Sequence, residues 1–399
     1  MNKGVAITGM GIISSIGNTL EENFQSLIDK KPGISKIKKI DTIHKDVIKV
    51  GEVDIDNAAL IQFLNLPESN NYSRTALLAE IAAKEAVKNA KIKDINQYKT
   101  GLISATSVGG MDKTEKYYYS YFEENKNRKY IDAHSLGDAT SKIASSLGIT
   151  DFVTTISTAC SSATNAIMLG ARMIKSGKLD RVIVGGADCL SKFTINGFKT
   201  LMILSETDCK PFDENRTGLN LGEAAAFLVL ESDSVVAREN KEVLAYISGY
   251  ANANDAFHQT ASSENGEGAT LAMKKALDIA NLSPNDIDYI NAHGTATPNN
   301  DSSESKAILR VFENNMPSFS STKGYTGHTL AAAGAIEAVY SILALQNDMV
   351  FPNLNFNTPI SETKLIPETE VLKKNINHVL SNSFGFGGNC STLIFSKKY

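Results

Sequence analysis

Cysteine is scarce in this chain of 399 residues, which contains only Cys160, Cys189, Cys209 and Cys390. These four show neither the paired CxxC spacing of a zinc site nor the density of a disulfide framework. We therefore expect four thiols.

Positive charge is not in excess either. The 40 lysines and arginines are outnumbered by 44 aspartates and glutamates, which gives a formal net charge of −4 at pH 7. No basic stripe interleaved with aromatic residues is visible, so polyanions are not attracted by the chain as a whole. We expect no nucleic-acid partner.

Long apolar runs are also lacking. The longest, such as 224–230 and 331–335, fall far short of the roughly 20 residues that span a bilayer. The start, MNKGVAITGMG, enters a strand pattern at once and lacks the parts of a signal peptide. We expect no membrane span and a cytoplasmic protein.

The composition that remains is that of a soluble globular protein, with 42% hydrophobic and 21% charged residues. Apolar, β-rich runs alternate with helical patterns, which predicts an α/β fold with strands buried between helical layers. The predicted strands are Val5–Thr8, Gly101–Ala105, Phe152–Ile156, Arg181–Gly185, Ala225–Leu230, Val243–Ser248, Ile287–Asn291 and Ser391–Phe395.

One pattern of elements occurs twice. An alanine-rich helix at 76–90 is followed by Lys-Asp-Ile and a strand that ends near 106, and a similar helix at 269–280 is followed by Asn-Asp-Ile and a strand that ends at 293. Chance similarity between alanine-rich helices is the alternative. A duplicated half explains the length of the chain.

Cys160 and His328 match in the same way, because each opens a helix crowded with small residues. The charged stretch 231–242 separates two predicted strands and is a natural boundary. We therefore predict two related halves, 1–240 with the cysteine and 241–399 with the histidines.

Cys160 is the candidate nucleophile. It lies where a β-rich run meets a helical run, so it is placed on a strand-to-helix turn. The unpaired N–H groups and the dipole of a helix N-terminus favour a thiolate there. A small buried residue among alanines and serines is the alternative.

Two histidines have unusual settings. His293 directly follows a predicted strand, where α/β proteins place their chemistry, and His328 ends the segment Lys323-Gly-Tyr-Thr-Gly-His. A histidine N–H there can donate toward developing negative charge. Glu337, nine residues after His328, is a candidate partner for Lys323, with a solvated helical glutamate as the alternative. His44, His134, His258 and His378 have no such setting.

Two glycine-rich stretches stand out. The segment 383–389 is too rich in glycine to predict regular structure, and it can bring a backbone N–H close to a reacting carbonyl while an aromatic ring gates the entrance. A tight turn with aromatic plugs is the alternative. Gly9 and Gly11 are similar to a dinucleotide fingerprint, but Gly17 comes six positions later instead of three, which argues against a nucleotide site.

Taken together, these motifs resemble the β-ketoacyl-acyl-carrier-protein synthases, condensing enzymes of the thiolase-like superfamily. The resemblance spans nearly the whole chain and rests on STACSSATNAI, PFDENRTGLNLGEAAAFLVLE, NAHGTATPNND, STKGYTGHTLAAAGAIE and NSFGFGGN, in that order. It implies a thiolase-like fold, two related halves in a five-layer α-β-α-β-α arrangement, and usually a dimer. No metal or organic cofactor is implied.

Matched by motif, the resemblance implies that Cys160, His293 and His328 are catalytic. It also implies that Lys323 and Glu337 form a supporting ion pair.

Thr295 and Thr297 resemble the threonines that hydrogen-bond the pantetheine arm of the substrate. Phe384 and Phe386 would border and gate the site, and the backbone N–H groups of Cys160 and Phe386 would form the oxyanion hole.

The implied reaction is a decarboxylative Claisen condensation between an acyl group on Cys160 and malonyl-acyl-carrier protein. Implied partners are the acyl carrier protein and a second subunit, identical or related. Because such carriers are acidic, a basic patch is expected, and Lys126, Arg128 and Lys129 are the candidates. A solvated loop is the alternative there.

Departures from the family bear on the substrate. The stretches RTGLNLGEAAAFL and GFGGNCSTLIF differ from those of fatty acid enzymes and resemble synthases of aryl polyene and flexirubin-type pigments. Two other functions stay open. A chain-length-factor-like partner subunit usually lacks the cysteine retained here, and a degradative thiolase uses a second cysteine, for which Cys390 is the candidate.

Overall fold

The computed structural model describes residues 4–123, 125–313 and 315–397. Its large sheet has ten strands in the order β11-β10-β14-β15-β9-β1-β8-β6-β4-β5. Five of these strands come from the first half of the chain: β1 (Val5–Ile13), β4 (Thr100–Ala105), β5 (Phe152–Ile156), β6 (Arg181–Asp188) and β8 (Ala224–Glu231). The others are β9 (Ala245–Asn254), β10 (Tyr289–Asn291), β11 (Ser318–Ser320), β14 (His378–Gly385) and β15 (Asn389–Ser396).

Only a short seam joins the two halves of this sheet. β1 pairs with β8 over most of its length but with β9 only at Val5, Ala6 and Ile7. Each half therefore behaves as a five-stranded sheet that needs its own helical cover on both faces.

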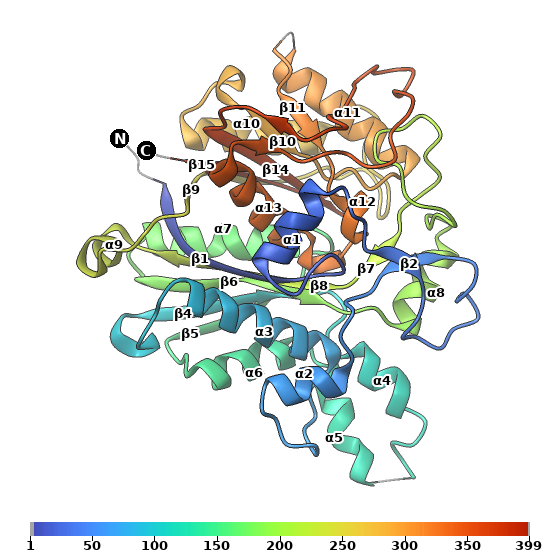
Figure 1. The fold of residues 1–399 in the computed structure, drawn as a ribbon, viewed down its shortest axis with the longest axis vertical. Coiled ribbons are helices and arrows are strands. Elements are labelled where there is room, and N and C mark those ends of the chain that lie inside the picture. The colour runs from blue at the N-terminus through green and yellow to red at the C-terminus, as the bar shows by residue number, and fades with distance from the viewer. Residues whose placement is uncertain (1–3, 124, 314, 398–399) are drawn as a thin grey trace.

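The helices form three layers around these two half-sheets (Figure 1). The central layer is α7 (Ser162–Lys175) and α13 (Ala333–Asn347). The outer layers are α3 (Arg74–Asn89) with α6 (Gly137–Leu147), and α10 (Glu267–Ala280) with α11 (Pro298–Phe312). This five-layer α-β-α-β-α arrangement confirms the predicted fold class. It also shows the repeat, because α3 and α10 are each followed by a 3₁₀ turn and a strand, β4 or β10.

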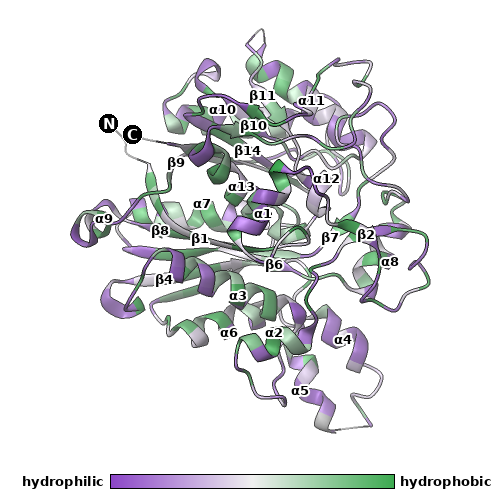
Figure 2. Cartoon of the chain, viewed as in Figure 1, coloured by the Kyte–Doolittle hydropathy of each residue, from purple (hydrophilic) through white to green (hydrophobic). Residues whose placement is uncertain are grey.

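α13 is apolar on every side because it lies between two sheets. All residues from Ala333 to Leu345 are buried, and hydrophobic colour gathers on α7 and α13 in Figure 2. The segment Leu330–Asn347 is long and apolar enough to cross a membrane, yet 89% of it is buried inside the protein. A helix that is hydrophobic all round and enclosed by its own protein is a core helix.

Gly9 and Gly11 in β1 serve packing. A Cβ at Gly11 would lie 2.3 Å from the carbonyl oxygen of Ala82 in α3, and one at Gly9 would lie 2.5 Å from that of Ala86. The glycines therefore let an alanine-rich helix approach the strand closely, which agrees with the rejection of a nucleotide site.

The prediction that 383–389 is irregular was wrong at both ends. β14 continues to Gly385 and β15 begins at Asn389, with Phe384 opposite Cys390. Only the three residues between the strands turn, and Gly387 and Gly388 take φ values of +82° and +79° there. Cross-strand pairing thus determined the conformation of the flanking residues.

The remaining elements surround the layers. They are α1 (Leu20–Ile28), β2 (Ile34–Lys36), β3 (Lys49–Gly51), α2 (Asn57–Phe63), α4 (Met111–Tyr117), α5 (Arg128–Ile131), α8 (Lys192–Thr200), β7 (Leu221–Gly222), α9 (Asp233–Glu239), α12 (Lys323–Thr326), β12 (Met349–Val350) and β13 (Leu372–Lys373). Arg74 of α3 and Glu223, which directly follows β7, form a buried ion pair at 2.7 Å. This pair connects the surrounding elements to the helical layer of the first half.

Candidate active site

Cys160 lies in the turn between β5 and α7, and only 6% of it is exposed. Ala159, just before it, takes a φ of +53°, a left-handed conformation that is strained for a residue with a Cβ. Inside this turn, the Thr158 N–H donates to Ser162 Oγ at 2.8 Å. The turn directs the thiol into the protein.

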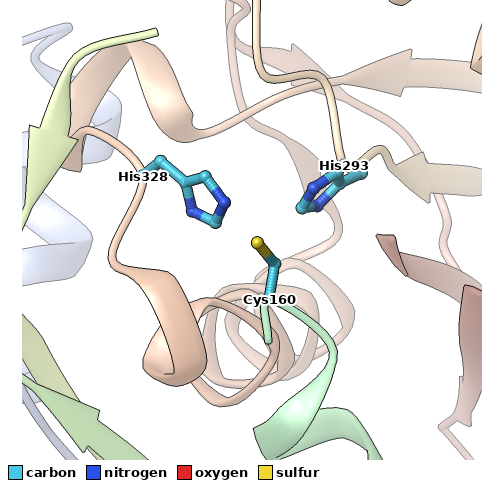
Figure 3. Close-up of side chains that lie close together, drawn as sticks. All are labelled: Cys160, His293 and His328. Carbon is cyan, nitrogen blue, oxygen red and sulfur yellow. The ribbon is translucent and has the colours of Figure 1, made fainter. Parts of the chain in front are cut away.

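Two histidines face this thiol across the boundary between the halves (Figure 3). Sγ of Cys160 and one ring nitrogen each of His293 and His328 lie within 4.8 Å of one another. The two imidazole rings are 5.4 Å apart and nearly perpendicular. The structure thus brings together the three residues that the sequence singled out, one from the first half and two from the second.

The neighbours of each ring fix its tautomer. Lys323 Nζ lies 3.2 Å from Nδ1 of His293, and an ammonium can only donate. The Leu330 N–H donates to Nδ1 of His328 at 3.3 Å. Because both Nδ1 atoms accept, both Nε2 atoms carry the proton and are donors.

Burial keeps both rings neutral. It lowers the pKa of His293 well below 6.5, with further lowering from the Lys323 charge and from His328. Burial and the Lys323 charge likewise lower the pKa of His328 well below its usual range. At pH 7 the site therefore presents two neutral N–H donors.

The thiol of Cys160 behaves differently from the expectation. Burial raises its pKa to about 11, although the Lys323 charge and the backbone N–H groups of Phe386 and Cys160 act in the opposite direction. The expectation that the helix start would favour a resting thiolate was wrong, because desolvation outweighs it. The backbone N–H groups of Phe386 and Cys160 both contact Sγ. They therefore lie close to the reacting sulfur, as the predicted oxyanion hole requires.

Lys323 and Glu337 form a buried ion pair, with each residue about 2% exposed. Lys323 also donates to the backbone carbonyl of His293 at 2.5 Å. The pair therefore places a positive charge behind one histidine and compensates it with a carboxylate from α13. Glu337 is not a solvated glutamate.

A pocket of about 220 Å³ leads to the three residues. Thr295 and Thr297 line it, with their hydroxyl oxygens 2.8 Å apart. Phe386 lines it too and stacks on Phe198 at 6.0 Å between ring centroids. Phe384 packs 5.8 Å from the ring of His293. The residues expected to bind and gate the substrate thus share one cavity with the thiol.

Acidic residues that the sequence analysis missed hold the histidine loop. Glu304 accepts the N–H groups of His293 and Gly294, both at 2.8 Å, and burial raises its pKa to about 7. Asp301 accepts the N–H of Ala296 at 3.1 Å. The available signal was their position in the first two turns of α11, six and nine residues after the NAHGT motif ends.

The candidate basic residues lie elsewhere. Arg128 and Lys129 belong to α5 and do not line this pocket; Lys129 Nζ donates to the carbonyl of Ser69 at 2.7 Å. The side chain of Lys126 lies outside the described part of the chain.

The other cysteines are free thiols, as expected, and all are buried. Cys390 lines the same pocket but does not belong to the cluster of Cys160 with the two histidines. Burial, together with Asp255 and Glu304, raises its pKa to about 12.

Comparison with known proteins bears on this geometry. Residues 2–235 match the model of the β-ketoacyl synthase N-terminal domain, and 244–357 match that of the C-terminal domain. The chain is 35% identical over 411 residues to 3-oxoacyl-[acyl-carrier-protein] synthase 2 of Staphylococcus aureus (strain COL), with 99% of each chain covered.

Solved structures agree. The ishigamide ketosynthase/chain length factor gives a TM-score of 0.93 at 28% identity, covering all of both chains. A type II polyketide synthase structure, in which a ketosynthase is in complex with its acyl-carrier protein, gives 0.88 at 26% identity, covering 99% of this chain and 100% of the other. With two matching domain models and a whole-chain relative, this protein belongs to the β-ketoacyl synthase family of condensing acyltransferases.

Proposed function

We propose that Cys160 takes an acyl group from a carrier-protein thioester and that His293 and His328 stabilise the enolate formed when a malonyl thioester loses CO₂. The observation that carries this proposal is the convergence of one thiol and two neutral Nε2–H donors at the end of one pocket. Both histidines have the neutral protonation state that a hydrogen-bond donor of this kind needs at pH 7.

In the first half-reaction, Sγ attacks the acyl carbonyl, and the N–H groups of Cys160 and Phe386 stabilise the oxyanion. The carbon–sulfur bond to the carrier breaks, and the carrier leaves as a thiol. Since the resting thiol is protonated, its proton moves to the departing pantetheine sulfur. Acylation is therefore balanced without a permanent thiolate.

In the second half-reaction, the malonyl thioester carbonyl lies between His293 and His328. Their N–H groups stabilise the negative charge that develops on this oxygen as the carboxylate leaves as CO₂. The enolate carbon then attacks the acyl-cysteine, and the carbon–sulfur bond to Cys160 breaks. The products are a β-ketoacyl-carrier thioester and the Cys160 thiolate, which takes one proton from solvent to return to the resting thiol.

Neither half-reaction needs a metal or an organic cofactor. The three clustered side chains have ligand-like spacing, but the Lys323 ammonium, 3.2 Å from His293 Nδ1, opposes a further cation. We propose that Lys323 and Glu337 act by holding the tautomer of His293.

Two partners follow from the proposal. An acidic carrier protein docks near the pocket, with Arg128 and Lys129 on α5 as candidate contacts and Lys126 beside them in the sequence. A second subunit, identical or related, pairs along β5, which is the last strand in the sheet order, with Val153 41% exposed. We expect the assembly in the cytoplasm.

The acyl group itself is chosen by the apolar wall of Phe198, Ile203 and Leu219. Fatty acid, polyketide and aryl polyene elongation all use this chemistry. We propose that this protein acts in aryl polyene elongation, because residues 216–228 and 385–395 differ from the corresponding stretches of fatty acid enzymes and resemble those of aryl polyene synthases.

The partner-subunit alternative is opposed by the intact cluster of Cys160, His293 and His328. The degradative thiolase is opposed by the position of Cys390, which lines the pocket but lies outside the cluster of Cys160 with the two histidines.

Intact-mass spectrometry tests the proposal. Wild type and Cys160→Ala are each incubated with a panel of acyl-carrier thioesters and then with malonyl-carrier protein. We expect acylation of the wild type alone, followed by transfer to a β-ketoacyl product. If neither protein is acylated, the chain is a partner subunit instead.

A further inference from the structure

Next to the turn that carries Cys160, three asparagines from three separate elements meet. Asn165 lies on α7, Asn252 on β9 and Asn389 at the start of β15. Asn389 Oδ1 is the common acceptor, at 2.9 Å from Asn165 Nδ2 and 2.7 Å from Asn252 Nδ2. Each amide is matched donor to acceptor, and a satisfied polar network of this kind makes the groups that it joins rigid.

This cluster reaches the turn that carries Cys160. Ser161 Oγ lies 2.7 Å from Asn389 Oδ1, and Asn165 Nδ2 donates to Thr158 Oγ at 2.9 Å. The residues on both sides of the strained Ala159 and of Cys160 are therefore held by amides from elsewhere in the fold.

A second layer orients the amides themselves. Asn165 Oδ1 accepts from Ser391 Oγ at 2.9 Å and from Asn252 Nδ2 at 3.1 Å. With its oxygen occupied by these donors, Asn165 must turn its NH₂ toward Thr158 and Asn389. The flip state of this amide is thus set by the network.

We propose that Asn389, with Asn165 and Asn252, is a positioning element for the Cys160 turn. It holds the thiol at the convergence of the Cys160 and Phe386 N–H groups against the strain at Ala159. This inference rests on the proposed role of Cys160 as nucleophile.

The location of Asn389 makes the role specific. It follows the Phe386–Gly388 turn by one residue, and Gly385, its partner across the hairpin, would place a Cβ 2.8 Å from the carbonyl oxygen of Thr158. The same hairpin therefore supplies the Phe386 N–H and fixes the nucleophile turn. Displacing Asn389 would change the distance between the backbone N–H groups of Cys160 and Phe386, which form the proposed oxyanion hole.

The test compares Asn389→Leu, which keeps the side-chain size but removes the acceptor, with Asn389→Asp, which keeps an acceptor oxygen. Ser396→Ala is the matched control, because it removes a buried side-chain hydrogen bond from the same strand, to Ser248 Oγ at 2.7 Å, outside this cluster. The readout is the single-turnover rate of Cys160 acylation per folded molecule, with folding followed by thermal unfolding. The malonyl-carrier KM is measured in parallel.

We expect Asn389→Leu to slow acylation about 10- to 100-fold with an unchanged malonyl KM, Asn389→Asp to restore part of the loss, and Ser396→Ala to stay within about threefold. If Asn389→Leu is acylated at the wild-type rate, this inference is overturned, while Cys160 remains the nucleophile. Equal losses in Asn389→Leu and Asn389→Asp, in proportion to lost folding, also overturn it. Absence of acylation in the wild type contradicts the proposed function instead.

Discussion

The Lys323 ammonium contacts His293 twice, donating to its backbone carbonyl at 2.5 Å and lying 3.2 Å from its ring Nδ1. One cation thereby fixes the position of the main chain and the tautomer of the ring. It also lowers the pKa of both catalytic-site histidines. Burial is the larger cause of that lowering, and the single charge of Lys323 adds to it.

Lys323→Met should therefore impair condensation more than acylation. Without the ammonium, His293 can carry its proton on Nδ1, which removes the donor that faces the malonyl oxygen. We expect the single-turnover condensation rate to fall about 100-fold, while acylation of Cys160 falls less.

Loss of Lys323 also leaves Glu337 buried without its partner, so Lys323→Met is combined with Glu337→Gln to separate stability from tautomer effects. Lys199→Met, which breaks a more exposed pair with Glu206 at 3.0 Å, is the control. Equal losses in the acylation and condensation rates would contradict the role of Lys323 in holding the tautomer of His293.

The pH dependence of condensation should reflect two histidines with lowered pKa values. Protonation of either Nδ1 would oppose the donor that contacts it, Lys323 or the Leu330 N–H. The condensation rate of pre-acylated enzyme should therefore stay constant from pH 7.5 to below 6.5 and fall only at more acidic pH. Single-turnover rates over this range check this, with the acylation step as the control. An acid limb centred at 6.5 or above would argue against the buried, neutral pair.

Thr297→Val should weaken binding of carrier-linked substrates. The change keeps the shape of the side chain but removes a hydroxyl that lines the pocket beside Thr295. One lost hydrogen bond corresponds to about a 3- to 10-fold rise in KM, with kcat within about twofold. A short acyl thioester without the pantetheine arm is the control and should be unaffected. Equal effects on both substrates would exclude an arm-binding role.

Arg74→Met should destabilise the fold without touching the site. Arg74 donates to Glu223 at 2.7 Å, and Glu223 also accepts the N–H groups of Val53 and Leu190. Removing the cation leaves a buried carboxylate unpaired, which typically costs about 3–5 kcal/mol in the free energy of unfolding. Denaturant unfolding measures this cost, and the double variant with Glu223→Gln should recover part of it. A change below about 1 kcal/mol would mean that this pair behaves like a surface pair.

The sequence was sufficient to predict the strands with long apolar runs, since β4, β5, β6, β8 and β15 all lie where such runs were expected. It did not predict β14, because Phe384 and Gly385 look like loop residues until β15 is beside them. Short strands such as β11 carry too few residues for a pattern to emerge. Pairing across the hairpin is a nonlocal interaction and leaves little local signal.

The family motifs by themselves determined which residues meet at the site, because Cys160, His293, His328 and Lys323 each stand in a recognisable local context. Only the tertiary structure decided how those groups ionise and what holds them. Burial raised the thiol pKa against the expected effect of the helix start, and Asn389 contacts Ser161 in the nucleophile turn across 228 residues of sequence. Desolvation and long-range hydrogen bonds depend on everything that surrounds a group in space, which neighbours along the chain do not specify.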